Sequence, residues 1–127
     1  GAVDDGASYA NAWLAAHPAG EGNLAIWGSW DDPAMGAISS LKQQFRDDVK
    51  VYGQNGNPEA IIAVQDGFMT ATIWEDSYME GYMLAKEYEV ITEQGDAYEV
   101  GYNEYPGVLI TAETVAEFMQ AHPEAVG

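Results

Sequence analysis

Polar and aromatic side chains follow three short apolar runs of this chain. The three groups are Ser29-Trp30-Asp31-Asp32, Gln54-Asn55-Gly56 and Glu75-Asp76. Trp30 lies within the first group, and Trp74 directly precedes the third. An indole face packs against the C–H face of a sugar ring, while carboxylates and amides fix its hydroxyl groups. The residue types therefore indicate a site for a sugar or polyol.

Arrangements that would carry catalysis or hold a metal are weaker. The chain has no cysteine, and its two histidines, His17 and His122, each precede a proline without a spaced acidic motif. No Gly-rich phosphate loop and no G-x-S-x-G elbow occurs. The adjacent carboxylates Asp31 and Asp32 point apart where a helix begins. We therefore predict no catalytic residue, no metal and no cofactor.

The charge of the chain is strongly negative. Four Lys and Arg residues stand against 21 Asp and Glu residues, a formal net charge of −17. Such a chain repels the phosphates of nucleic acids and disfavours anionic membrane surfaces. With 127 residues, 47% of them hydrophobic, the composition predicts one folded domain over residues 1–127.

The same charge predicts how stability responds to salt. Because like charges repel within the folded chain, added salt should screen them and raise the melting temperature. The measurement is a thermal melt in low and in molar sodium chloride. A melting temperature that stays constant between the two would contradict this expectation.

The sequence predicts alternating helices and strands. Apolar residues at helical spacing end at His17-Pro18, and the uninterrupted run Leu24–Trp27 is typical of a strand buried on both faces. Asp32-Pro33 and Asn57-Pro58 each resemble a helix start, with a capping side chain followed by proline. Further strands are expected over residues 49–53 and 69–74, and weaker ones over residues 98–102 and 108–110. Ser77 with Glu80 indicates a capping box for a long helix that Gly95 ends, and Thr111 is expected to cap the last helix.

This α-β-α-β-α-β-α order predicts an α/β fold, a partial doubly wound, Rossmann-like three-layer lobe with a parallel sheet. In such a sheet, ligands bind beyond the carboxyl ends of the strands, where the three polar groups lie.

Structural roles compete with the functional ones. Asp32 and Asp76 are also candidates for helix caps, and residues 54–56 for an ordinary turn with positive φ. We expect Trp13 and Trp27 in the core, and Phe45 on the buried stripe of its helix. Trp30 is the better candidate for function, because a large aromatic residue between a strand and a helix is costly unless it packs on something.

Several segments together resemble the type I periplasmic sugar-binding proteins, the ribose-binding-protein-like group of ABC transporter solute-binding proteins. Residues 25–37, AIWGSWDDPAMGA, are similar to the family segment (N/W)D-x-x-A-x-G-A. The resemblance continues, in the right order and spacing, through WLAAHP, VYGQNG, VQDG, ATIWE and the final GVLIT. It covers most of the chain.

The resemblance implies which residues bind ligand. Carried over one by one, the family's contacts fall on Trp30 with Asp31, on Gln54 with Asn55, and on Glu75. Many members have Asn at the Trp30 position, an aromatic–Asp pair at positions 54 and 55, and Gln at position 75. These departures leave the identity of the solute open.

The resemblance also implies a larger assembly. Family members are about twice this length, with two lobes that grip the solute, so the chain looks like a C-terminal portion that lacks the first lobe. The implied partners are a small solute, the missing N-terminal lobe or a second chain, and an ABC permease. The implied location is periplasmic or extracellular, with any signal peptide outside this chain.

Two other functions stay open at this point. The effector-sensing core of a lac-repressor-like transcriptional repressor resembles the same fold, although the acidic charge argues against a DNA-bound protein. A small α/β enzyme using Asp31, Asp76 or Glu75 is the third hypothesis.

Overall fold

The computed structural model describes residues 1–101 and 104–127, and these residues contain a four-stranded sheet. The strands are β1 (Leu24–Trp27), β2 (Val49–Tyr52), β3 (Ala71–Trp74) and β4 (Val108–Thr111), and they lie in the order β1-β2-β3-β4. The pairs β1–β2 and β2–β3 are parallel, as predicted, whereas β4 runs antiparallel to β3. The α/β fold class is confirmed, with a mixed and mostly parallel sheet.

Five α-helices accompany these strands in the described residues. They are α1 (Ala2–Ala16), α2 (Asp31–Gln43), α3 (Pro58–Gln65), α4 (Ser77–Gln94) and α5 (Val115–Ala121), with short 3-10 turns at Gly95–Ala97 and Pro123–Ala125. The order of the first seven elements is the alternation that the sequence predicts. The weak strand over residues 98–102 is wrong for residues 98–101, and Tyr102 lies outside the described residues. The strand over 108–110 is confirmed within β4.

The chain divides into two compact units. The first comprises Gly1–Trp74 and Val108–Gly127, and the second Glu75–Gly107. The second unit contains α4, which has no buried residue and exposes apolar side chains along its length, among them Tyr78, Tyr82, Leu84 and Tyr88.

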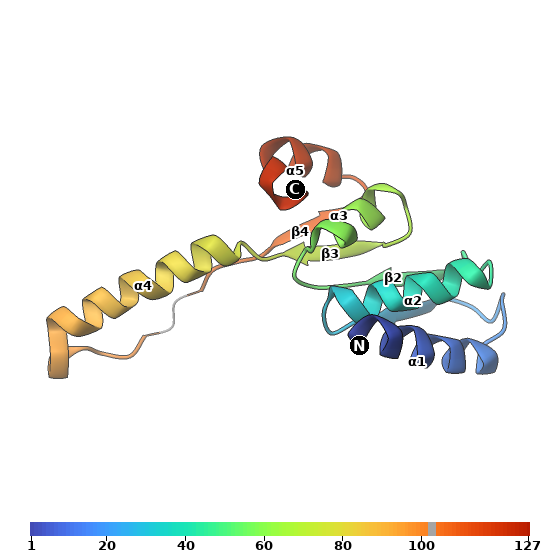
Figure 1. Ribbon diagram of the computed structural model, residues 1–127, viewed down its shortest axis with the longest axis horizontal. Helices are drawn as coiled ribbons and strands as arrows, with labels where there is room; N and C mark the ends of the chain where they lie inside the picture. Colours follow the sequence, from blue (N-terminus) through green and yellow to red (C-terminus); the bar gives the residue numbers. More distant parts are fainter. Residues whose placement is uncertain (102–103) are drawn as a thin grey trace. The chain divides into compact units, whose positions relative to one another are not determined.

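The core of the first unit lies between the helices and one face of the sheet. Val51 and Ile110 are fully buried on this face, against Ile61 of α3 and side chains of α2 and α5. Helices α1 and α2 lie side by side (Figure 1), and Leu14 of α1 belongs to the same core. This packing holds β1, β2 and β3 in register and so fixes where their carboxyl ends lie.

The other face of the sheet carries exposed apolar side chains. The strand register and the alternation of side chains place Ala25, Trp27, Ile73 and Leu109 on this face. Trp27 is 67% exposed and Leu109 is 58% exposed. Mostly parallel sheets are normally covered on both faces, whereas the described residues cover only one face of this sheet.

Two aromatic residues expected in the core lie on the surface instead. The prediction that Trp27 lies in the core is wrong, because this residue is on the uncovered face of the edge strand β1. Phe45 is 91% exposed, because α2 ends at Gln43 and Phe45 adopts a positive φ of 54° beyond it. Trp13 packs against the core, as predicted.

Helix starts differ from the sequence prediction in three places. Helix α2 begins at Asp31, one residue before the expected cap Asp32. Helix α4 is capped by Asp76, which accepts a hydrogen bond from the Met79 amide at 3.0 Å, rather than by Ser77. Thr111 ends β4 instead of capping α5, whose N-cap position is Thr114.

Candidate functional site

The carboxyl ends of β1 and β2 are held together by backbone hydrogen bonds. The Gly28 amide donates to the Tyr52 carbonyl at 2.9 Å, which extends the pairing of β1 and β2 past the end of β1. The Gly53 amide donates to the Ala71 carbonyl at 3.1 Å, and Asn55 forms an isolated parallel bridge with Trp74. Residues 28–31, residues 53–57 and the end of β3 therefore lie together along the carboxyl-terminal edge of the sheet, where β1, β2 and β3 end.

Trp30 lies at the entrance to α2. It occupies the N-cap position with extended backbone angles, φ −153° and ψ 179°, and its side chain is 43% exposed. An exposed indole at the edge where the strands end is available to pack against a ligand. The structure thus places Trp30 between the end of β1 and the start of α2.

Asp31 has a different environment. Its side chain is fully buried, and its two oxygens accept hydrogen bonds from the Thr72 hydroxyl at 2.8 Å and from the Asn57 amide at 2.7 Å. Burial raises the pKa of the Asp31 carboxyl above its usual value, while the hydrogen bonds from Asn57 and Thr72 act against this rise. Because the raised pKa disfavours the charged form in the folded state, this group's contribution to stability falls as the pH rises through that pKa.

Residues 54–57, the 54–57 turn, follow β2 with a bend at Gln54 and an isolated bridge at Asn55. Asn55 has a φ of 98° and Gly56 a φ of 68°, so the positive φ predicted for Asn or Gly in this segment is confirmed. A Cβ on Gly56 would lie 2.5 Å from the Cα of Trp74, which shows how closely this turn approaches β3. Gln54 and Asn55 are half-buried within it.

The third group of polar residues, Glu75-Asp76, follows the end of β3 and lies in the second unit. Trp74 packs edge-on against Phe118 at 5.2 Å between ring centroids and also contacts the ring of His122. Glu75 follows Trp74 and is the first residue of the second unit, and Asp76 next to it caps α4. Asp76 therefore has the structural role that was weighed for it.

Asp32, the other candidate cap, accepts a hydrogen bond from the Asn57 side-chain amide at 3.2 Å. Asn57 thus bonds both carboxylates at the start of α2, through its backbone to Asp31 and through its side chain to Asp32. Sequence reasoning identified Asn57 only as a helix cap and did not single out Thr72. The available sequence signal was a threonine among the apolar residues of the strand Ala71–Trp74.

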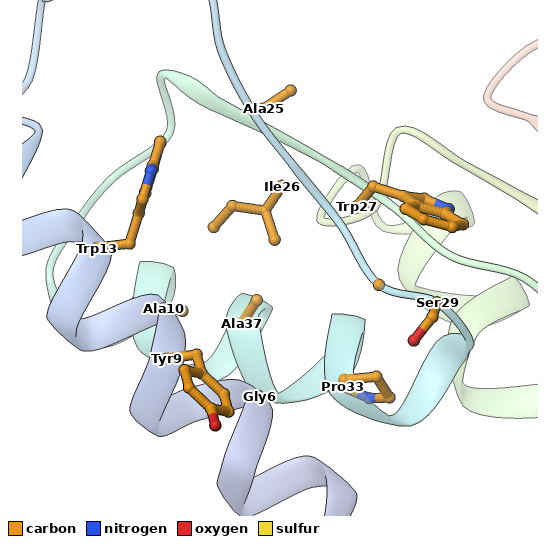
Figure 2. Close-up of a pocket in the computed structure, with 11 residues that line it drawn as sticks. Gly6, Tyr9, Ala10, Trp13, Ala25, Ile26, Trp27, Ser29, Pro33 and Ala37 are labelled. Carbon is orange, nitrogen blue, oxygen red and sulfur yellow. The ribbon is translucent and has the colours of Figure 1, made fainter.

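A hollow of about 400 Å³ lies between α1 and the edge strand β1 in the first unit and reaches Gly28 and Ser29 at the end of β1. Figure 2 shows Tyr9 and Trp13 of α1 on one side and Ile26 of β1 facing them. None of the residues lining it is charged, and neither Trp30 nor the 54–57 turn contributes to it. The hollow offers hydroxyl groups from Tyr9 and Ser29 but no carboxylate or carboxamide, whereas the strand ends carry both, so the candidate site stays at the strand ends.

The described residues carry neither a cluster of metal-binding side chains nor a membrane-crossing helix. Within residues 1–101 and 104–127, no group of three or more His, Cys, Asp and Glu residues is arranged to hold a metal ion. In the same residues, no helix combines the length and the apolar character that a membrane crossing requires.

The chain is similar to known proteins over most of its length. A family model described as a periplasmic binding protein domain matches residues 2–102. No curated protein sequence matches the chain closely enough to count as a relative.

Among solved structures, an ABC transporter solute-binding protein from Agrobacterium vitis with bound allitol is 26% identical, with a TM-score of 0.84. The match covers 94% of this chain and 41% of that one. A solute-binding protein from Bacillus halodurans with bound myo-inositol is 26% identical, with a TM-score of 0.72, covering 93% of this chain and 39% of that one. An ABC sugar transporter subunit from Rhodobacter sphaeroides is 30% identical, with a TM-score of 0.74, covering 87% and 39%. The chain thus spans about two-fifths of the length of these structures.

Proposed function

Because the chain belongs to the periplasmic binding protein domain family, we propose that it binds a sugar or polyol as one part of a two-lobed solute-binding protein. The family consists of solute binders rather than enzymes, which agrees with the absence of catalytic motifs from the sequence. The resemblance inferred from residues 25–37 is confirmed by the family match.

The convergence of three strand ends carries this proposal. Trp30, Gln54 and Asn55 occur along one edge of the sheet, and Glu75 follows the strand that completes that edge. Trp30 supplies an apolar face, and Gln54 and Asn55 supply donors and acceptors for hydroxyl groups. Allitol and myo-inositol, bound by two of the similar proteins, are compounds of this kind.

Three uncovered surfaces support the proposal that further chain completes the site. These are the apolar face of the sheet around Trp27 and Leu109, the hollow beside the edge strand β1, and the exposed apolar side chains of α4. Covering them would stabilise the protein by removing apolar surface from water. We propose that the remainder of a longer protein, or a second chain, covers them and supplies the other half of the site.

In that context the protein would deliver its solute to an ABC permease from a periplasmic or extracellular location. Half of a two-lobed site makes only part of the ligand contacts, so this chain alone should bind solute weakly.

A thermal-shift screen tests the proposal. The screen would use this chain and, in parallel, the proposed longer protein of which it is a part. Each would be heated with pentoses, hexoses, polyols and amino acids. A ligand at about 100 times its Kd stabilises by about 2.7 kcal/mol, a shift of several degrees. We expect a selective shift with one sugar or polyol in the longer protein and a smaller shift, or none, in this chain.

Light scattering in the same buffers serves as the control for oligomerisation. A shift that accompanies a change in molecular mass would be assigned to association. Selective stabilisation by amino acids, or no stabilisation by any solute in the longer protein, would contradict the proposal. A ligand-independent dimer without any shift would favour the repressor-like hypothesis.

A further inference from the structure

We propose that Asp31 is a positioning residue for the solute site: its buried carboxylate anchors the 54–57 turn, which carries Gln54 and Asn55, to the start of α2 and to β3. This inference rests on the proposed function, because it assigns a role within that site. It also separates Asp31 from its neighbour Trp30, which the structure leaves exposed.

Burial argues against contact between Asp31 and a solute. The residue has 0% relative exposure, so no face of the carboxylate is open at the edge of the sheet. One oxygen accepts from Thr72 at 2.8 Å and the other from the Asn57 amide at 2.7 Å. The carboxylate thus connects the three strand ends, since it lies at the start of α2 and bonds both the turn after β2 and a residue within β3.

The turn has a conformation that needs such an anchor. Asn55 has a φ of 98°, a region that residues other than glycine adopt at a cost of about 1–3 kcal/mol. The amides of Asn57, Gly56 and Gln54 all favour the charged form of Asp31. Because these amides belong to one turn of four residues, a single carboxylate constrains the backbone on both sides of Asn55.

Because Gly53 has no side chain, the Asp31 carboxylate can lie close to the backbone at this position. A Cβ at this position would lie 2.2 Å from the Asp31 Oδ1 atom, a distance that no real side chain tolerates. The end of β2 therefore approaches Asp31 at van der Waals distance through a glycine. The close approach brings the amides of the following turn within reach of the carboxylate.

The charge of Asp31 is balanced by hydrogen bonds rather than by a cation. In the parts of the chain that the structure describes, no Lys or Arg forms an ion pair with it. Burying a carboxylate in this way is costly, and its hydrogen-bond partners are the turn and Thr72. The partners thus indicate that the group holds the turn in place.

The test compares three variants with the unaltered chain, Asp31→Asn, Asp31→Ala and Thr72→Val, with Asp47→Asn as the matched control. Asp47 is exposed, so its variant removes one negative charge without touching the turn. Asn at position 31 keeps an oxygen for the Asn57 amide, and its own amide group donates to the Thr72 hydroxyl. Thr72→Val removes that hydroxyl at a buried position that no solute reaches.

The primary readout is backbone amide hydrogen exchange of residues 54, 56 and 57, measured by NMR without solute. Asp31→Ala and Thr72→Val should accelerate exchange at these amides by about tenfold or more, while Val51 and Ile61 in the core keep their rates. Asp31→Asn and the control should stay within about threefold of the unaltered chain.

The second readout is affinity for the solute selected by the thermal-shift screen, measured in the longer protein. Asp31→Asn should keep the affinity within about threefold, whereas Thr72→Val should weaken it by about tenfold. Loss of affinity in Asp31→Asn with unchanged exchange of the turn would overturn the proposal, because it would make Asp31 a direct contact.

Unchanged exchange of the turn in Thr72→Val would also overturn it, and this variant decides the matter even if Asp31→Ala does not fold. Faster exchange in Thr72→Val and Asp31→Ala, without binding of any solute by the unaltered protein, would support the anchoring role and contradict the proposed function instead. The two failures are therefore distinguishable.

Discussion

Replacing Gly36 with alanine is expected to lower the melting temperature of the chain by roughly 10 °C, an effect of about 3 kcal/mol for a domain of this size. A Cβ at this position of α2 would lie 2.0 Å from the Val3 carbonyl oxygen and 2.8 Å from the Ala7 nitrogen. Both atoms belong to the backbone of α1, so the contact is relieved only if the two helices move apart. The loss exceeds the gain of about 1 kcal/mol that alanine brings to a helix interior.

The expected mechanism is loosening of α1 from α2. Gly6 of α1 makes the reciprocal approach, because a Cβ there would lie 2.3 Å from the Pro33 carbonyl oxygen. The Ser40 hydroxyl also donates to the Ala7 carbonyl at 2.9 Å across the same contact. Separation of the helices would weaken this bond and the packing of Leu14 in the core.

Gly81→Ala is the matched control, because Gly81 also lies inside a helix but a Cβ there would meet open space. This variant should leave the melting temperature unchanged or raise it slightly. If Gly36→Ala melted within about 2 °C of the unaltered chain, the close packing of α1 on α2 would be contradicted.

Replacing Trp30 with alanine is expected to weaken solute binding by more than about tenfold in the longer protein, with little change in its melting temperature. The indole is 43% exposed in this chain and caps no helix through its side chain, so its removal leaves the core intact. Its loss removes the apolar face on which we propose the solute ring packs. Isothermal titration and a thermal melt of the same samples measure the two effects.

Phe45→Ala provides the comparison for Trp30. Phe45 is a large aromatic residue that is 91% exposed, and it follows α2 at the end opposite to Trp30. Its removal should change neither the affinity nor the melting temperature. A large fall in melting temperature in Trp30→Ala, with unchanged affinity, would instead assign the indole to packing.

The order of elements and the three strand ends could be predicted from the sequence because the signals are local. Prolines after Asp32 and Asn57 mark the first turns of α2 and α3, and short stretches rich in apolar residues mark the strands. Since strand ends follow directly from strand positions, the candidate residues Trp30, Gln54 and Asn55 could be located as well.

What the sequence missed depends on contacts between distant residues. Leu24–Trp27 is apolar throughout, which predicts burial on both faces, yet the described chain covers only the face of Leu24 and Ile26. The antiparallel pairing joins β3 and β4, which are separated in the sequence by residues 75–107, so no short hairpin turn could indicate it. The anchoring geometry of Asp31 depends on Thr72, 41 residues away, which no local pattern shows.

The most direct test of the central claim, that the strand ends form part of a sugar or polyol site, is an NMR titration of the indole N–H signals. The chain contains four tryptophans, so each signal can be assigned by substitution. With saturating solute in the longer protein, the Trp30 signal should shift more than the signal of Trp13, which packs against the core. A Trp30 signal that stays unchanged while solute is demonstrably bound would place the site elsewhere and contradict the account.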